Sequence, residues 1–182
     1  MNRKILTIIL IVLFAALLIA ATVWYNKLSK NYDNGNITED SDQSAEIAPD
    51  FTVYDAEGDS VKLSDKLGKP VVINFWATWC GPCKMELPAF QNMFDKYGDE
   101  VEFMMVNMTN GRETEDGVKE FISNNGLSFP VYFDKDMDAA VTYNLRTIPR
   151  SMFINSDGTI ANSHIGVLSE DSLEKYIENI IK

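Results

Sequence analysis

The two cysteines of the chain, Cys80 and Cys83, are separated only by Gly81 and Pro82. Two thiols at this spacing can form a disulfide with each other and exchange it with a second disulfide. The apolar run 71–76 just before them predicts a buried strand, and a helix is predicted to follow. Unsatisfied N–H groups at a helix N-terminus favour a thiolate over a thiol, so we expect Cys80 to attack and Cys83 to resolve.

Three other uses of a cysteine pair fit the sequence poorly. Covalent haem attachment requires a histidine directly after the second cysteine, where this chain has Lys84. Structural zinc usually takes four Cys or His ligands, and the chain has two cysteines and one histidine, His164. A structural disulfide across so few residues would constrain the unfolded chain little. We therefore expect redox chemistry with no cofactor and no metal, and a structural or surface role for His164.

The flanking sequence predicts alternating strands and helices that would hold the cysteine pair at the end of a central strand. Such alternation is typical of an α/β fold with parallel strand pairs, here ending in an antiparallel hairpin. The predicted strands are 51–54, 61–63, 71–76, 101–108, 129–133, 151–154 and 159–165. The predicted helices follow Cys83 and Thr114, span 137–143, and form the C-terminal segment, where one apolar stripe carries Leu173, Tyr176, Ile177, Ile180 and Ile181.

The stretch Trp79 to Lys84, with Cys-Gly-Pro-Cys inside it, resembles the active site of the thioredoxin family. Ala48 to Phe51 and Gly68 to Pro70, around the first predicted hairpin, resemble the TlpA/ResA-like thiol-disulfide oxidoreductases, an exported and often membrane-anchored branch of that family. The resemblance covers residues 47–182. It implies a thioredoxin fold, a central mixed β-sheet flanked by helices, with an N-terminal β-hairpin and an inserted helix–strand unit within 107–146.

The same resemblance implies which residues contact a substrate. Trp79, Gly81 and Pro82 would surround the reactive sulfur. Ile148 and Pro149 would form a cis-proline loop that faces the cysteines and docks the substrate backbone, and proline is the residue for which a cis bond costs little. The alternative for Pro149 is an ordinary proline at the start of a strand.

Proton transfer at the second cysteine points to Glu86. The buried aspartate of thioredoxins matches Asn74, which cannot exchange a proton, whereas TlpA/ResA-like proteins have a glutamate at the place of Glu86. Glu86 follows Cys83 by three residues and should share its helix face. Burial would raise the pKa of its carboxyl and suit it to relay the proton of Cys83. A solvated helix glutamate is the alternative. We further expect Cys80 to be accessible and Cys83 to be buried.

Residues 1–25 predict a transmembrane signal-anchor. The stretch 5–25 contains no charged side chain and as a helix would reach about 30 Å, the thickness of the hydrocarbon core of a bilayer. Arg3 and Lys4 before it favour a cytoplasmic N-terminus. A cleaved signal peptide is the alternative, with 20–22 as a weak cleavage site. In either case the remainder of the chain would be exported.

The rest of the chain divides into a linker and one domain. The polar, acidic stretch 26–46 cannot bury enough apolar surface to fold and is expected to be a flexible tether. Residues 47–182 are enough for one hydrophobic core. The formal net charge of −11 makes generic nucleic-acid binding improbable, because that requires a basic patch.

These features predict an extracytoplasmic thiol-disulfide oxidoreductase, held at the cell membrane, that acts on protein disulfides. The Gly-Pro dipeptide between the cysteines is that of reducing thioredoxin, so a reductase supplied by a membrane thiol donor is favoured. The resemblance implies apocytochrome c during its maturation as one substrate. A disulfide-forming oxidase of the same fold is the first alternative. The others are a peroxiredoxin-type peroxidase, whose Thr-x-x-Cys motif the Thr78–Cys80 spacing does not match, and a non-catalytic binding module.

Overall fold

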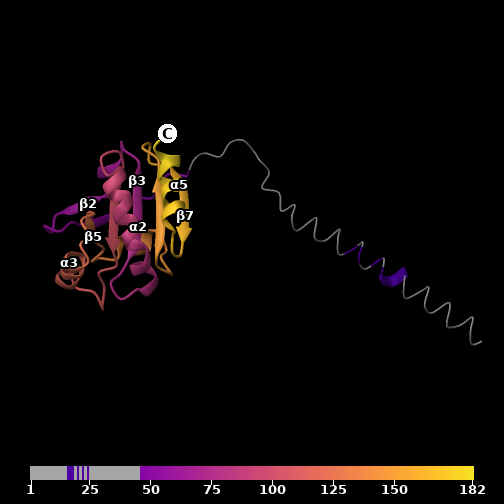
Figure 1. Ribbon diagram of the computed structural model, residues 1–182, viewed down its shortest axis with the longest axis horizontal. Coiled ribbons are helices and arrows are strands. Elements are labelled where there is room, and N and C mark those ends of the chain that lie inside the picture. Colours follow the sequence, from indigo (N-terminus) through magenta and orange to yellow (C-terminus); the bar gives the residue numbers. More distant parts are fainter. Residues whose placement is uncertain (1–15, 19, 21, 23, 25–45) are drawn as a thin grey trace, which may run out of the picture. The chain divides into compact units, whose positions relative to one another are not determined.

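The computed structural model of the 182-residue chain describes residues 16–18, 20, 22, 24 and 46–182. Ala45–Lys182 form one compact unit, which contains the sheet described below (Figure 1). The predicted anchor and linker lie outside the described residues, apart from the few positions just named. In the part of the chain that is described, no helix combines the length and the apolar character needed to cross a bilayer.

The folded unit is built on one mixed sheet of seven strands in the order β2-β1-β5-β4-β3-β6-β7. The three strands β3, β4 and β5 run parallel, whereas β6 and β7 on one side and the β1–β2 hairpin on the other add antiparallel pairs. The strands are β1 (Thr52–Tyr54), β2 (Ser60–Lys62), β3 (Val71–Trp76), β4 (Glu102–Asn107), β5 (Val131–Phe133), β6 (Arg150–Ile154) and β7 (Ile160–Ile165).

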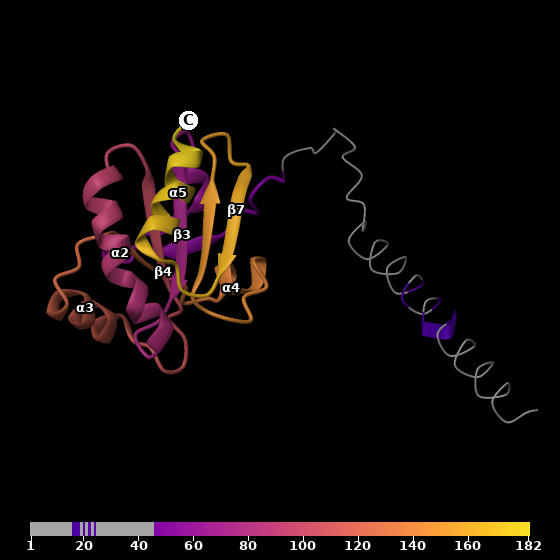
Figure 2. The ribbon, with the colours of Figure 1, turned by 45° about the vertical axis from the view of Figure 1, so that its right-hand side comes forward.

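Helices cover both faces of the sheet. On one face α2 and α5 lie side by side, as Figures 1 and 2 show, and Asn92 of α2 donates to Glu170 of α5 at 2.9 Å. Val118 of α3 packs into the same core as α2, and Ala139 of α4 packs into the core on the opposite face. The helices are α2 (Gly81–Tyr97), α3 (Glu115–Asn124), α4 (Asp138–Thr142) and α5 (Glu170–Ile180), with a 3₁₀ turn η1 (Leu63–Lys66) after β2.

The central strand β3 contributes to both cores, and all six of its residues are buried. Successive side chains of a strand point to opposite faces. Val72 and Trp76 therefore pack under α2, while Ile73 and Phe75 pack toward α4. Asn74 shares the face of Val72 and Trp76, which directs a polar side chain from the middle of the sheet toward α2.

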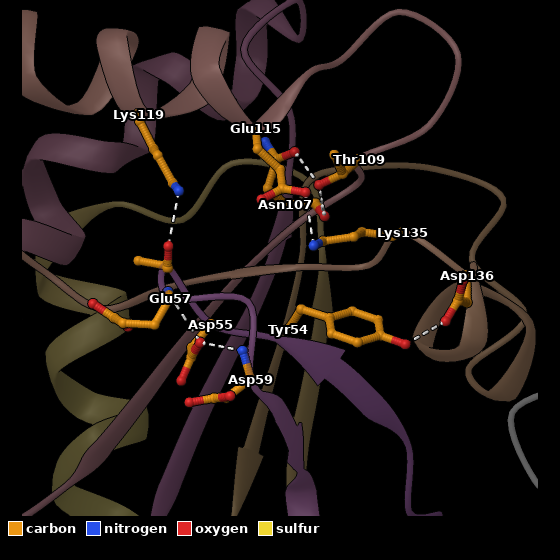
Figure 3. A network of polar contacts seen from close by, with 11 residues as sticks. Tyr54, Asp55, Glu57, Asp59, Asn107, Thr109, Glu115, Lys119, Lys135 and Asp136 are labelled. Atoms are coloured by element: carbon orange, nitrogen blue, oxygen red, sulfur yellow. Dashed lines mark hydrogen bonds and ion pairs between the residues drawn. The ribbon is translucent and has the colours of Figure 1, made fainter.

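Polar contacts join the first hairpin to the segment between β4 and α4 (Figure 3). The Tyr54 hydroxyl donates to Asp136 at 2.7 Å, and Lys119 of α3 donates to a backbone carbonyl of the hairpin turn at 2.8 Å. Lys135 forms an ion pair with Glu115 at 2.7 Å. The N-terminal hairpin and the segment between β4 and α4 thus stabilise each other.

The observed elements confirm the α/β interpretation of the sequence, including both hairpins, the buried strand over 71–76 and the inserted helix–strand unit. One difference is the turn η1, which begins at Leu63, where the sequence predicts the end of a strand. The Asp65 carboxylate accepts from the backbone N–H of Lys62 at 2.9 Å, and this local bond turns the chain out of β2.

Candidate active site

The two cysteines lie where β3 passes into α2. The chain turns after Trp76, with Cys80 N donating to the carbonyl of Ala77 at 3.2 Å, and Cys80 then caps the N-terminus of α2. Cys80 and Cys83 form a disulfide with an S–S distance of 2.05 Å, and Cys83 N donates to Cys80 Sγ at 3.2 Å. Once the disulfide is reduced, the same N–H group and the helix dipole favour a thiolate on Cys80.

The two sulfurs are less different in exposure than the sequence predicted. Cys83 is fully buried, as expected. Cys80 was expected to be accessible, but it is only 5% exposed in the disulfide form, because the loop before β6 packs against it: Cys80 Sγ lies 3.9 Å from the carbonyl oxygen of Ile148. The exposed part of the motif is Gly81 and Pro82.

The loop that packs against Cys80 is the predicted cis-proline loop. The Ile148–Pro149 peptide bond is cis, and Pro149 is buried directly before β6. Beside the loop, a groove of about 210 Å³ is lined by Trp79, Ile148 and residues near α4. Trp79 is 50% exposed on the wall of this groove. Trp79 and Ile148, two of the residues expected to contact a substrate, therefore line one groove next to the disulfide.

Glu86 is buried beside the sheet rather than solvated. Its side chain is on the inner face of α2, is 1% exposed, and accepts from Asn74 Nδ2 at 2.7 Å and from the backbone N–H of Leu168 at 2.9 Å. Burial raises the pKa of the Glu86 carboxyl, and the two hydrogen bonds, which favour the ionised form, oppose this in part. The solvated alternative for Glu86 is thereby excluded.

The side-chain amide of Asn74 has hydrogen-bond partners at its nitrogen but none at its oxygen. Its Nδ2 donates to Glu86 and, at 3.1 Å, to the hydroxyl oxygen of Ser151 on the neighbouring strand β6. Its Oδ1 is buried without a hydrogen-bond partner. An unpartnered buried acceptor costs about 1–3 kcal/mol. Oδ1 and the Nδ2 that donates to Glu86 belong to the same amide group. A change in the protonation of Glu86 would therefore affect this amide directly.

Glu113 belongs to the site but was not predicted. It lies in the loop between β4 and α3 and is 9% exposed. Its carboxylate accepts from the backbone N–H of Thr78 and, at 2.7 Å, from the Thr78 hydroxyl, and Asn107 Nδ2 approaches it at 3.4 Å. One carboxylate therefore holds the turn that precedes Cys80. The loop has no periodicity that would distinguish Glu113 from solvent-facing acids such as Asp116.

Other polar and apolar features lie away from the disulfide. His164 is in β7, partly exposed, with its ring 6.3 Å from that of Tyr176, a placement consistent with a structural role. A wider apolar groove of about 460 Å³ lies between α3 and β5, lined by Val118, Ile122 and Phe129 among others, and contains none of the predicted site residues. Across the described residues, no group of three His, Cys, Asp or Glu side chains could hold a metal.

The chemistry open to this site is the exchange of a dithiol for a disulfide. The sulfur of Cys80 is at a helix N-terminus and faces a cis-proline loop, the sulfur of Cys83 is buried, and the buried carboxyl of Glu86 follows Cys83 by one helical turn. On a mixed sheet with helices on both faces, this arrangement defines the thioredoxin class of redox proteins.

Comparison with known proteins is more specific. Residues 45–163 match the AhpC/TSA family. Thiol-disulfide oxidoreductase ResA of Bacillus thuringiensis (strain Al Hakam) is 37% identical over 139 residues, which are 76% of this chain and 79% of that protein. Sporulation thiol-disulfide oxidoreductase A of Bacillus subtilis (strain 168) is 33% identical over 129 residues, 70% of this chain and 78% of that protein.

A solved structure of a similar protein also matches this chain. The crystal structure of StoA from Bacillus subtilis has a TM-score of 0.63 and 31% sequence identity, and the match covers 71% of this chain and 97% of that one. The chain belongs to the ResA/StoA-like thiol-disulfide oxidoreductases of the thioredoxin family, with an AhpC/TSA domain.

Proposed function

We propose that this protein is an extracytoplasmic protein-disulfide reductase that is tethered to the cell membrane and works through Cys80 and Cys83. The observation that carries the proposal is the Cys80–Cys83 disulfide at the N-terminus of α2, with Cys80 Sγ 3.9 Å from the Ile148 carbonyl. The groove lined by Trp79 and Ile148 lies beside this loop, so a segment of a protein substrate can approach Cys80 there.

The reaction has two exchange steps. The Cys80 thiolate attacks one sulfur of the substrate disulfide, which forms a Cys80–substrate disulfide and releases the other substrate sulfur as a thiolate. Cys83 then loses its proton and attacks Cys80 Sγ, so that the second substrate sulfur leaves and the Cys80–Cys83 disulfide closes. The substrate gains two electrons and the protein loses two.

Glu86 takes the proton that Cys83 loses. Both residues are buried, they are three positions apart on α2, and Asn74 has no ionisable proton to exchange. Burial moves the pKa of Glu86 upward, toward neutral pH. A group whose pKa is near the working pH can both accept and return a proton. When the disulfide is next reduced, Glu86 returns a proton to Cys83, and solvent supplies or removes the balance.

The dipeptide between the cysteines supports the proposed direction of electron flow. Gly81-Pro82 is the pair found in reducing thioredoxin, with a reduction potential of about −270 mV, against about −120 mV for a strongly oxidising relative. Outside the cytoplasm thiols tend to be oxidised, so the protein draws electrons from a thiol donor in the membrane. The uncharged stretch 5–25, with Arg3 and Lys4 before it, is the proposed anchor.

The test is the reduction potential of the Cys80–Cys83 pair, measured by equilibration with glutathione, together with reduction of insulin by the full chain in neutral detergent. We expect a potential within about 50 mV of the thioredoxin value and catalytic insulin reduction. The Cys83→Ser variant should accumulate mixed disulfides with its substrates. A potential near that of the oxidising relative would assign disulfide formation instead, and peroxide consumption without insulin reduction would assign a peroxidase.

A further inference from the structure

The groove beside the disulfide contains one cationic side chain. Arg146 lines it together with Trp79, Met137 and Ile148, and Arg146 is exposed. Trp79 and Met137 are 50% and 44% exposed, so the groove has apolar walls with a guanidinium at its edge. This cation lies beside the disulfide, on a chain with a net charge of −11.

The Arg146 guanidinium is not paired with any carboxylate in the described chain. Its hydrogen bond is to a neutral acceptor, Asn144 Oδ1, at 3.4 Å. The four ion pairs among the described residues all use lysines as the cation. The acids nearest in sequence to the groove residue Met137 are bound elsewhere: Asp136 accepts from the Tyr54 hydroxyl, and Asp138 from a backbone N–H of β1, each at 2.7 Å. Arg146 therefore retains its capacity to bind an anion.

The position of Arg146 relative to Cys80 limits where that anion can be. Ile148 contacts Cys80 through its carbonyl oxygen, and Arg146 is two residues earlier in the same loop. Two residues of chain span at most about 7 Å, and Thr147 and Ile148 form a bend, so the guanidinium is near the carbonyl that contacts Cys80. Consider a peptide that lies along the loop with its cysteine at Cys80. The side chain that reaches the guanidinium would then belong to a residue within about three positions of that cysteine.

We infer that Arg146 selects protein substrates in which an aspartate or glutamate lies within about three residues of the cysteine under attack, while the groove receives an apolar neighbour of that cysteine. The inference rests on the proposed function, since it requires a protein disulfide as substrate, and it adds the chemistry of the sequence around that disulfide. Arginine suits this role because its planar guanidinium binds a carboxylate through two parallel hydrogen bonds.

The test uses the reduced full chain in neutral detergent and a matched set of disulfide-linked peptide dimers. Each peptide has one cysteine and a leucine beside it, with Asp, Asn or Lys two residues away. The rate constant for reduction is measured for the wild type, Arg146→Gln, Arg146→Glu and Lys175→Gln. Lys175 is an exposed residue of α5 outside the groove, so its substitution changes the net charge as Arg146→Gln does without touching the groove.

For the wild type we expect the Asp peptide to react about 2- to 5-fold faster than the Asn peptide, the range of an exposed ion pair, even though the net charge of the protein repels it. The preference should disappear in Arg146→Gln, reverse toward the Lys peptide in Arg146→Glu, persist in Lys175→Gln and weaken as salt is added.

Two results would overturn the inference, and they differ. If the wild type reduces all three peptides at one rate, or if Arg146→Gln and Lys175→Gln behave alike, Arg146 does not select the substrate, but the proposed reductase stands. If no form of the protein reduces any of the peptides or insulin, the proposed function itself fails and takes the inference with it.

Discussion

Replacing Glu86 with glutamine should leave the fold intact and slow disulfide exchange by about 10- to 100-fold, at or below the low end of general acid–base contributions. That factor corresponds to about 1.4–2.7 kcal/mol in the activation free energy. Glutamine has the size of glutamate and its carbonyl oxygen can accept from Leu168 N, but it has no proton to exchange with Cys83.

The cost of Glu86→Gln to stability should be small because Asn74 can adapt to it. The new amide nitrogen would face Asn74 Nδ2, which is also a donor. If the Asn74 amide turns over, its unpartnered Oδ1 becomes the acceptor that the glutamine needs. We therefore expect a change in the unfolding free energy within about 1 kcal/mol, the net value of one hydrogen bond. Glu86→Ala, in contrast, leaves the buried Leu168 N–H without its acceptor and should cost roughly 1–3 kcal/mol from that group alone.

The pH dependence of stability should also separate wild type from Glu86→Gln. Because burial raises the pKa of Glu86 in the folded protein, the folded state holds a proton at pH values where the unfolded chain has lost it. The resulting stabilisation is complete below the ordinary glutamate pKa of about 4.3 and is lost as the pH rises through the folded pKa. Urea denaturation of the oxidised protein at a series of pH values should show this loss in the wild type but not in the variant.

The kinetic assay is alkylation of the reduced protein across pH, followed separately at Cys80 and Cys83, with insulin reduction as the catalytic readout. Glu120→Gln is the matched control, because Glu120 is an exposed glutamate on α3. The relay is refuted if the pH–rate curves of wild type and Glu86→Gln superimpose while both proteins are folded.

Other predictions test the turn, the sulfurs and the N-terminal segment. Glu113→Ala removes the carboxylate that accepts from the backbone N–H and the hydroxyl of Thr78, and it should lower the unfolding free energy by about 1–2 kcal/mol in urea denaturation. The loss should exceed that of Glu113→Gln, which keeps one acceptor oxygen; equal stability of the two variants would contradict this role. In the reduced protein near neutral pH, iodoacetamide should label Cys80 before Cys83, as read by mass spectrometry of peptides, because Cys83 is fully buried; equal rates would argue against Cys80 as the nucleophile. Protease added to intact cells should remove the chain beyond about residue 26 while the N-terminal segment stays with the membrane fraction; release of a shortened protein into the medium would instead indicate signal cleavage.

The fold and the redox pair could be predicted from the sequence because their signals are local. The run 71–76 is apolar enough to require burial on both faces, and Cys80 and Cys83 are adjacent to its end. The burial of Glu86 could also be predicted, since a residue three positions after a buried helical cysteine shares its face. These signals are local, whereas the thioredoxin fold as a whole was inferred from the alternation of elements and the resemblance over residues 47–182.

Contacts between distant segments could not be predicted in the same way. Glu113 meets Thr78 across 35 residues, and nothing near either residue in the sequence indicates the pairing. The low exposure of Cys80 likewise depends on Ile148, 68 residues away, so a helix N-terminus alone suggested a more open sulfur. Asn74 could be identified as unable to exchange a proton, but its unpartnered Oδ1 follows only from the positions of Ser151 and Glu86.

The backbone N–H of Leu168 has a consequence for where a proton on Glu86 must be. A main-chain amide nitrogen can only donate, so the Glu86 oxygen that faces it, Oε2, must remain an acceptor in every protonation state. The other oxygen, Oε1, faces the side-chain amide of Asn74, which has both a donor and an acceptor to offer. In the proposed relay the two oxygens of one carboxyl group therefore differ: Oε2 stays bound to the segment before α5, and Oε1 is the atom at which a proton would be gained and lost.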